Sequence, residues 1–153
     1  MAKDLKFFMR ERKEEIITAP GPDSILGENG KPIGLEIKVL TGTEIQKIED
    51  SYRKRSIAVN EKGAPYISGG EVLFKTEKDS LRATRHIIAE ALVYPNLKDP
   101  KLMEFYNCVD MTEMPRLVFH RADEYTHVLK AVFIALGLSE APSDDKTLED
   151  AKN

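Results

Sequence analysis

The side chains best suited to chemistry are three histidines, His86, His120 and His127, and the single cysteine, Cys108. His120 and His127 are seven residues apart, so they share a face only if one helix runs through both. A zinc site needs histidines at i and i+4 or a tighter cluster of ligands. A cysteine needs a neighbouring base to act as a nucleophile, and no sequence signature supplies one. We therefore expect no metal site and no nucleophilic catalysis.

Adjacent carboxylates and paired glycines are the other residues with chemical potential. Neighbouring carboxylates do not share a helix face, so they do not converge on one substrate atom. The glycines are not followed by a Gly-Lys-Ser/Thr or dinucleotide-binding pattern, which indicates turns rather than phosphate sites. The pairs are Glu49 with Asp50, Asp144 with Asp145, Glu149 with Asp150, and Gly69 with Gly70. These patterns predict no enzyme and no cofactor.

An apolar stripe near the N-terminus is the candidate binding site of this sequence. Its spacing predicts an amphipathic helix over residues 2–16, within an N-terminal unit of residues 1–17. Residues 18–34 hold three prolines and four glycines, which predicts a linker. The helix either folds back on its own core or docks onto a partner or another copy of the chain. The partner-binding candidates are Leu5, Phe8, Met9 and Ile16.

The middle of the chain predicts short strands and one helix. Residues 35–39 alternate apolar and polar side chains, as a half-buried strand does. Thr43 and Gln46 form a capping-box pattern for a helix that runs to about Arg55, with a solvated cationic end at residues 53–55. Further strand candidates are residues 57–59, 66–67 and 72–74, and the residues expected to be buried in the helix are Ile45, Ile48 and Tyr52.

The C-terminal half predicts a series of helices. Thr76 or Asp79 can cap the first, Asp99 with Pro100 starts the second, and a third, carrying Leu117 and Val118, follows Thr112. The last has the strongest period and ends at Gly137. The apolar positions are Leu81, Ile87, Ile88, Ala91 and Leu92 in the first, Leu102, Met103 and Tyr106 in the second, and Tyr125, Val128, Leu129, Val132, Phe133 and Leu136 in the last.

These elements predict an α+β fold with a small antiparallel sheet and a mainly helical C-terminal half. The folded domain is expected over residues 35–138, with a polar tail over residues 139–153. The chain has 23 Lys and Arg against 26 Asp and Glu, a net charge of −3, which argues against nucleic acid as a partner. One cysteine, no apolar run of membrane length and no signal peptide indicate a cytoplasmic protein that does not bind membranes.

Several segments resemble, in the same order, the XkdN-like phage tail assembly chaperones. The most specific is LVYPNLKDPKL at residues 92–102, which is similar to a Tyr-Pro-x-Leu-x-Asp segment of that family. Residues 5–8, 30–38 and 41–44 resemble the family's N-terminal segment, strand and helix start. The sequence departs from the pattern at Leu35, where the family has Trp, and at Asn107, where it has Gly. Asn tolerates the left-handed conformation of glycine, so the turn can be kept.

The resemblance implies a non-enzymatic chaperone of the host cytoplasm. It would bind the tape-measure protein, hold it until tail-tube subunits polymerise around it, and be absent from the finished virion. The alternative is a structural tail or head-completion protein that is retained in the particle. An enzyme and a DNA-binding module are further alternatives, but the first lacks a clustered acid and histidine set and the second lacks positive charge.

Overall fold

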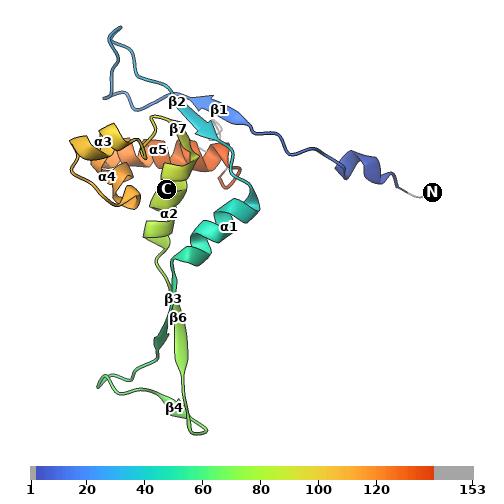
Figure 1. Cartoon of the computed structure of the whole chain (residues 1–153), viewed down its shortest axis with the longest axis vertical. Coiled ribbons are helices and arrows are strands. Elements are labelled where there is room, and N and C mark those ends of the chain that lie inside the picture. Colours follow the sequence, from blue (N-terminus) through green and yellow to red (C-terminus); the bar gives the residue numbers. More distant parts are fainter. Residues whose placement is uncertain (1–2, 140–153) are drawn as a thin grey trace, which may run out of the picture.

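The computed structural model describes residues 3–139, and its α+β architecture confirms the predicted fold class (Figure 1). Small antiparallel sheets alternate with helices, and most of the helices lie in the C-terminal half. The strands are β1 (Ile16–Ala19), β2 (Leu35–Lys38), β3 (Arg53–Ile57), β4 (Ile67–Ser68), β5 (Glu71–Val72), β6 (Phe74–Lys78) and β7 (Leu92–Tyr94). The helices are α1 (Gly42–Ser51), α2 (Ser80–Ala91), α3 (Pro100–Phe105), α4 (Met114–Val118) and α5 (Ala122–Ala135), with 3-10 turns η1 (Leu5–Phe8) and η2 (Met111–Glu113).

The main sheet has the order β1-β2-β7, and both neighbouring pairs are antiparallel. The alternation predicted for β2 is confirmed, because Leu35 and Ile37 are buried while Glu36 between them is exposed. Strand β7 was expected to be the end of a helix. It is extended because Pro95 disfavours the helical conformation at the residue before it, and because β7 pairs with β2.

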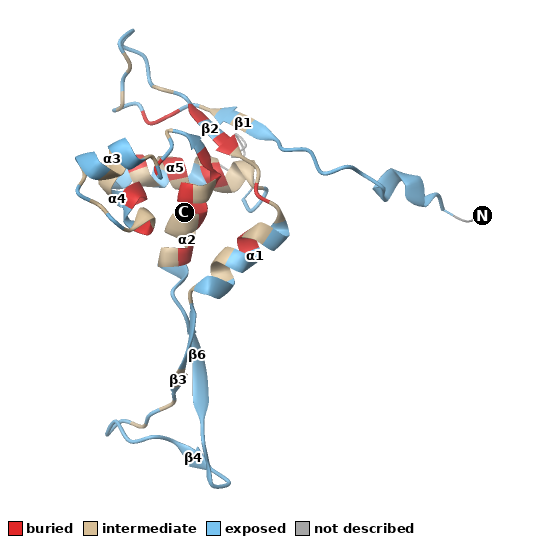
Figure 2. Ribbon diagram, viewed as in Figure 1, coloured by how far each residue is buried: buried red, intermediate tan, exposed pale blue. Residues whose placement is uncertain are grey.

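The core lies between this sheet and helices α2 and α5, where the buried residues of Figure 2 gather. Ile88 in α2 and Val128 and Val132 in α5 are completely buried. Leu129 and Phe133, expected to be buried, are half-buried and pack against the edge of the core. The stripe of α5 is therefore present, and its most deeply buried line runs through Val128 and Val132, with Leu129 and Phe133 at its side.

Helix α1 begins and ends earlier than its sequence suggests. Thr41, not Thr43, is the cap, and its hydroxyl accepts a hydrogen bond from the backbone nitrogen of Glu44 at 3.2 Å. The helix ends at Ser51, so the cationic run of residues 53–55 belongs to β3 and not to a helix end. The reason is tertiary, because β3 pairs along its whole length with β6. The caps predicted at Asp79 and Asp99 are confirmed.

The N-terminal helix predicted over residues 2–16 does not form. From residue 3, where the described part of the chain begins, to residue 15, the only helical element is the 3-10 turn Leu5–Phe8, and Ile16 begins β1 instead. Ile16 and Ile17 pair with Lys38 and Ile37 of β2, which gives these two residues a partner that an isolated amphipathic helix lacks.

Residues 18–34 are not the free linker that their composition suggested. Ala19 belongs to β1, and Gly21 lies so close to Ile33 that an added Cβ would be 1.9 Å from the Ile33 carbonyl oxygen. Further along, the Ser24 hydroxyl donates a hydrogen bond to Glu124 of α5 at 2.5 Å. The first part of the segment, residues 19–25, is therefore packed on the body of the protein, whereas residues 26–32 form a mostly exposed loop. Of the predicted polar tail, residues 140–153 lie outside the described residues.

Candidate partner-binding surfaces

Two of the three histidines and the cysteine have structural partners. The Tyr52 hydroxyl and Nδ1 of His86 are 2.5 Å apart, and Nε2 of His127 is 2.8 Å from the backbone oxygen of Pro20. His120 precedes α5, so no single helix carries both it and His127. The Cys108 thiol donates to the backbone oxygen of Asp110. Within residues 3–139, no three His, Cys, Asp or Glu side chains are grouped as metal ligands.

Charged groups near the core also brace the fold. Asp110 accepts hydrogen bonds from the backbone nitrogen and hydroxyl of Thr112, which hold the pKa of its carboxyl below the ordinary value. The same carboxylate forms an ion pair with Arg82 at 2.8 Å and so ties η2 to α2. Glu124 is buried, and the hydrogen bond from Ser24 lowers its pKa. Each of these carboxylates is hydrogen-bonded or ion-paired within the fold, and these contacts hold the helices in position.

The N-terminal segment of residues 3–15, here called the arm, projects from the body (Figure 1). It is anchored at its C-terminal end, where Arg12 forms an ion pair with Glu44 at 3.0 Å and the backbone nitrogen of Val39 donates a hydrogen bond to the backbone oxygen of Glu15. From Arg12 towards the N-terminus, the arm runs away from the sheet, and its apolar side chains are exposed. The exposed fractions are 68% for Leu5, 70% for Phe7, 82% for Phe8 and 76% for Met9.

The four predicted partner-binding residues therefore divide into two groups. Leu5, Phe8 and Met9 lie together in or beside the 3-10 turn of the arm. Ile16 lies in β1, apart from them, and is half exposed. Phe7, which is 70% exposed, belongs with the arm residues, although the predicted stripe did not include it. The adjacent pair Phe7 and Phe8 was the signal that this interpretation overlooked.

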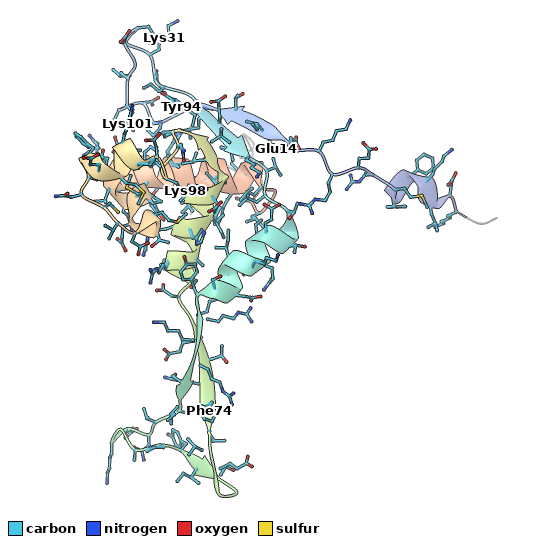
Figure 3. All side chains as sticks on the ribbon, viewed as in Figure 1. Glu14, Lys31, Phe74, Tyr94, Lys98 and Lys101 are labelled. Atoms are coloured by element: carbon cyan, nitrogen blue, oxygen red, sulfur yellow. The ribbon has the colours of Figure 1, made fainter. Side chains whose placement is uncertain are left out.

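A second exposed apolar surface lies on the segment of residues 53–78, here called the hairpin. Strands β3 and β6 form its stem, β4 and β5 lie near its tip, and it projects from the opposite side of the body to β1 (Figure 1). Figure 3 shows Phe74 well away from the body. The sequence predicted strands here but not their exposure, because strand patterns usually mark a core sheet. The exposed large apolar residues are Ile57, Val59, Tyr66, Ile67, Val72, Leu73 and Phe74.

A third exposed surface lies at the far edge of the main sheet, where β7 meets α3. An open hollow of about 460 Å³ is lined by Tyr94, Pro95, Leu102 and Phe105 among others, and Tyr94 and Lys101 mark it in Figure 3. Phe105 is 78% exposed. Tyr94 and Pro95 belong to the Tyr-Pro-x-Leu-x-Asp segment, and Leu102 and Phe105 lie in α3, which follows it.

Taken together, the described residues offer apolar surfaces that project into solvent. Contiguous exposed apolar patches of this kind mark sites of protein–protein contact. No helix of the described chain is both long enough and apolar enough to span a bilayer. The geometry therefore favours the binding of other proteins.

The sequence matches the family model of the phage XkdN-like tail assembly chaperone proteins over residues 5–152. The chain belongs to this family. The matched region of this tail assembly chaperone includes residues 5–15 of the arm, the hairpin and the sheet, so the apolar residues of all three exposed surfaces lie within it. The membership confirms the resemblance carried by residues 92–102, and implies phage tail proteins as partners.

The crystal structure of the protein YqbN has the same fold as this tail assembly chaperone. The two superpose with a TM-score of 0.67 at 22% sequence identity, over 91% of this chain and 100% of that one. At this level of sequence identity, the similarity is evidence of a shared fold alone. A search of curated proteins gives no significant match.

Proposed function

We propose that this tail assembly chaperone binds the tape-measure protein and helps to recruit tail-tube subunits during tail assembly. It would act in the host cytoplasm and leave before the virion is complete. Membership of the chaperone family supports this proposal. A chaperone of this kind needs exposed apolar contacts and a charged exterior for solubility, and it needs no active site.

The observation that carries the proposal is the exposed apolar surface of the arm. Phenylalanine and methionine side chains adapt to irregular apolar partners, which suits a long helical client with apolar stripes. Burying each side chain contributes roughly 1.5–3 kcal/mol before the costs of ordering the arm. Three or four such contacts give a reversible complex, as is needed when the tube displaces the chaperone.

The test is capture of the tape-measure protein from co-expressing cells. The triple variant Leu5→Ser, Phe8→Ser, Met9→Ser removes the apolar arm without touching the residues that anchor it at Arg12 and Glu15. We expect capture to fall by about tenfold or more, because most of an interface's affinity comes from a few apolar anchors.

The matched control is the double variant Leu26→Ser, Val109→Ser, which removes exposed apolar side chains elsewhere on the body. It should capture the tape-measure protein as the natural chain does. Equal capture by both variants would show that the arm is not part of the binding surface. Mass spectrometry of purified particles tests departure from the virion, and recovery of this chain in stoichiometric amounts would favour a structural tail protein instead.

A further inference from the structure

The hairpin is a two-stranded ribbon without a covering layer. Every residue of β6 is exposed, and so are four of the five residues of β3. An isolated two-stranded hairpin is marginally stable in water, and an unpaired strand edge attracts another strand. Within the stem, the Arg55 guanidinium lies 4.1 Å from the centre of the Phe74 ring, but no other layer of the described chain packs against either strand. A third strand alongside the stem would complete it.

The two edges of the stem differ in charge. Strand β3 carries Arg53, Lys54 and Arg55 in succession, whereas β6 carries Lys75 and Glu77 on either side of Thr76. Lys75 and Glu77 point to the same face and pair with each other at 2.8 Å. An antiparallel partner strand that presents Glu opposite Lys75 and Lys opposite Glu77 would match this edge.

Strand β6 is itself such a partner. We propose that β6 pairs antiparallel with β6 of a second copy, centred on Thr76, to form a four-stranded sheet β3-β6-β6-β3. In this register Lys75 lies opposite Glu77 of the second copy, and Glu77 lies opposite Lys75 of the second copy. The four side chains share one face, and opposite charges directly across a strand pair stabilise it.

The same arrangement through the other edge is disfavoured. Two copies of β3 paired about Arg55 would place Arg55 opposite Arg55 and would gather Arg53 and Lys54 of both copies beside them. Like charges directly opposite each other destabilise a strand pair. The charge pattern therefore selects the β6 edge and a two-fold symmetric pair.

The register also accounts for exposed apolar residues at both ends of the stem. Continued past the strands, it brings Val72 and Leu73 of the second copy to the level of Asp79 and Ser80. The side chain there with no covering in its own chain is Leu81, at the start of α2, which is 76% exposed. Each copy's apolar hairpin tip would then cover Leu81 of the other.

The overall charge distribution agrees with this pairing. Residues 53–78 hold six Lys and Arg against three Glu, a net charge of +3, whereas the body over residues 16–52 and 79–139 holds ten Lys and Arg against 14 Asp and Glu, a net charge of −4. The pair places the cationic hairpin of each copy beside the anionic body of the other. Complementary charge of this kind aligns two surfaces and raises the rate of association.

The test is the association state of the full chain measured by sedimentation velocity over a range of concentrations. The natural chain should form dimers as concentration rises. Lys75→Glu places Glu opposite Glu77 of the second copy, and Glu77→Lys places Lys opposite Lys75, so each variant alone should dimerise at least about tenfold more weakly. An equimolar mixture of the two variants restores both opposite-charge pairs and should form heterodimers.

Lys54→Glu is the matched control. Lys54 lies opposite Glu77 within the hairpin, so this change creates the same kind of like-charge pair inside the stem as Glu77→Lys does, but away from the β6 edge. It should dimerise as the natural chain does. A natural chain that stays monomeric at every concentration overturns the proposal. So do single variants that dimerise normally, a mixture that stays monomeric, or a Lys54→Glu chain that loses dimers as Lys75→Glu does.

Discussion

A single buried carboxylate fastens the segment that precedes β2 to the last helix. Glu124 accepts hydrogen bonds from the Ser24 hydroxyl and from the backbone nitrogen of Arg121, so it both caps α5 and holds residues 20–24. The contact between His127 and the Pro20 carbonyl lies one turn further along the same helix. These contacts explain why a stretch rich in proline and glycine is ordered against the body.

Glu124→Ala should destabilise the protein on the order of 1–3 kcal/mol at neutral pH, because a buried hydrogen-bonding carboxylate is lost. The hydrogen bond from Ser24 lowers the pKa of Glu124 in the folded state. Its stabilising contribution is therefore complete above the unfolded value of about 4.3 and is lost as the pH falls through the folded value. Thermal melts should show the difference between the two proteins shrinking in acid. A difference that grows in acid would contradict this assignment. The control is Asp123→Ala, which changes an exposed carboxylate of the same helix and should have a smaller effect at neutral pH.

Helix α2 shows that an apolar stripe on an element is buried only where another element lies against it. Leu81 and Ile88 are seven residues apart and so lie on the same side of the helix. Ile88 is completely buried between the sheet and α5, whereas Leu81 lies in the first turn, next to the base of the hairpin, and is exposed. The helical period predicted which face of α2 is apolar. How much of that face is buried depends on how far the sheet and α5 extend along the helix.

Ile88→Ala should therefore cost about 2–5 kcal/mol of unfolding free energy, since it leaves a cavity in the core. Leu81→Ala on the same helix should change it by less than about 0.5 kcal/mol when measured on the monomer. Urea denaturation followed by circular dichroism gives both values. Equal losses for the two variants would mean that Leu81 is packed within its own chain.

The whole molecule consists of a body of sheet and helices from which the arm and the hairpin project in different directions (Figure 1). The apolar residues that the body leaves exposed are concentrated on these two projections. The arm joins the body at residues 12–15, where its ion pair and backbone hydrogen bond lie. The buried core and most of the exposed apolar residues thus lie in separate parts of one chain.

Deleting residues 1–11 should leave the melting temperature within about 2 °C of the natural value, because that part of the arm contributes little burial. Deleting residues 1–19 also removes β1 and exposes the edge of β2, so the melting temperature should fall by about 5 °C or more. Differential scanning calorimetry of the two truncated chains tests this boundary. A large loss on the shorter deletion would show that the arm packs on its own body.

Much of the fold was determined by local sequence. Helix caps at Asp79 and Asp99, the helical stripe of α5 and the alternation of β2 are set by interactions within a few residues, and these predictions are confirmed. The motif of residues 92–102 likewise indicated the chaperone family through the order of its residues alone. Such features survive because their periods and hydrogen bonds do not depend on distant partners.

Only the tertiary structure decided where residues with ambiguous patterns belong. Ile16 suits a helix by spacing, but it pairs with β2, and residues 53–55 suit a helix end but pair with β6. The local sequence pattern also could not predict that the arm and the hairpin are exposed, because a strand or an apolar stripe has the same sequence whether or not another element covers it. The free energy of strand pairing and burial comes from contacts between segments far apart in the chain, and it outweighs the small intrinsic preferences of short segments.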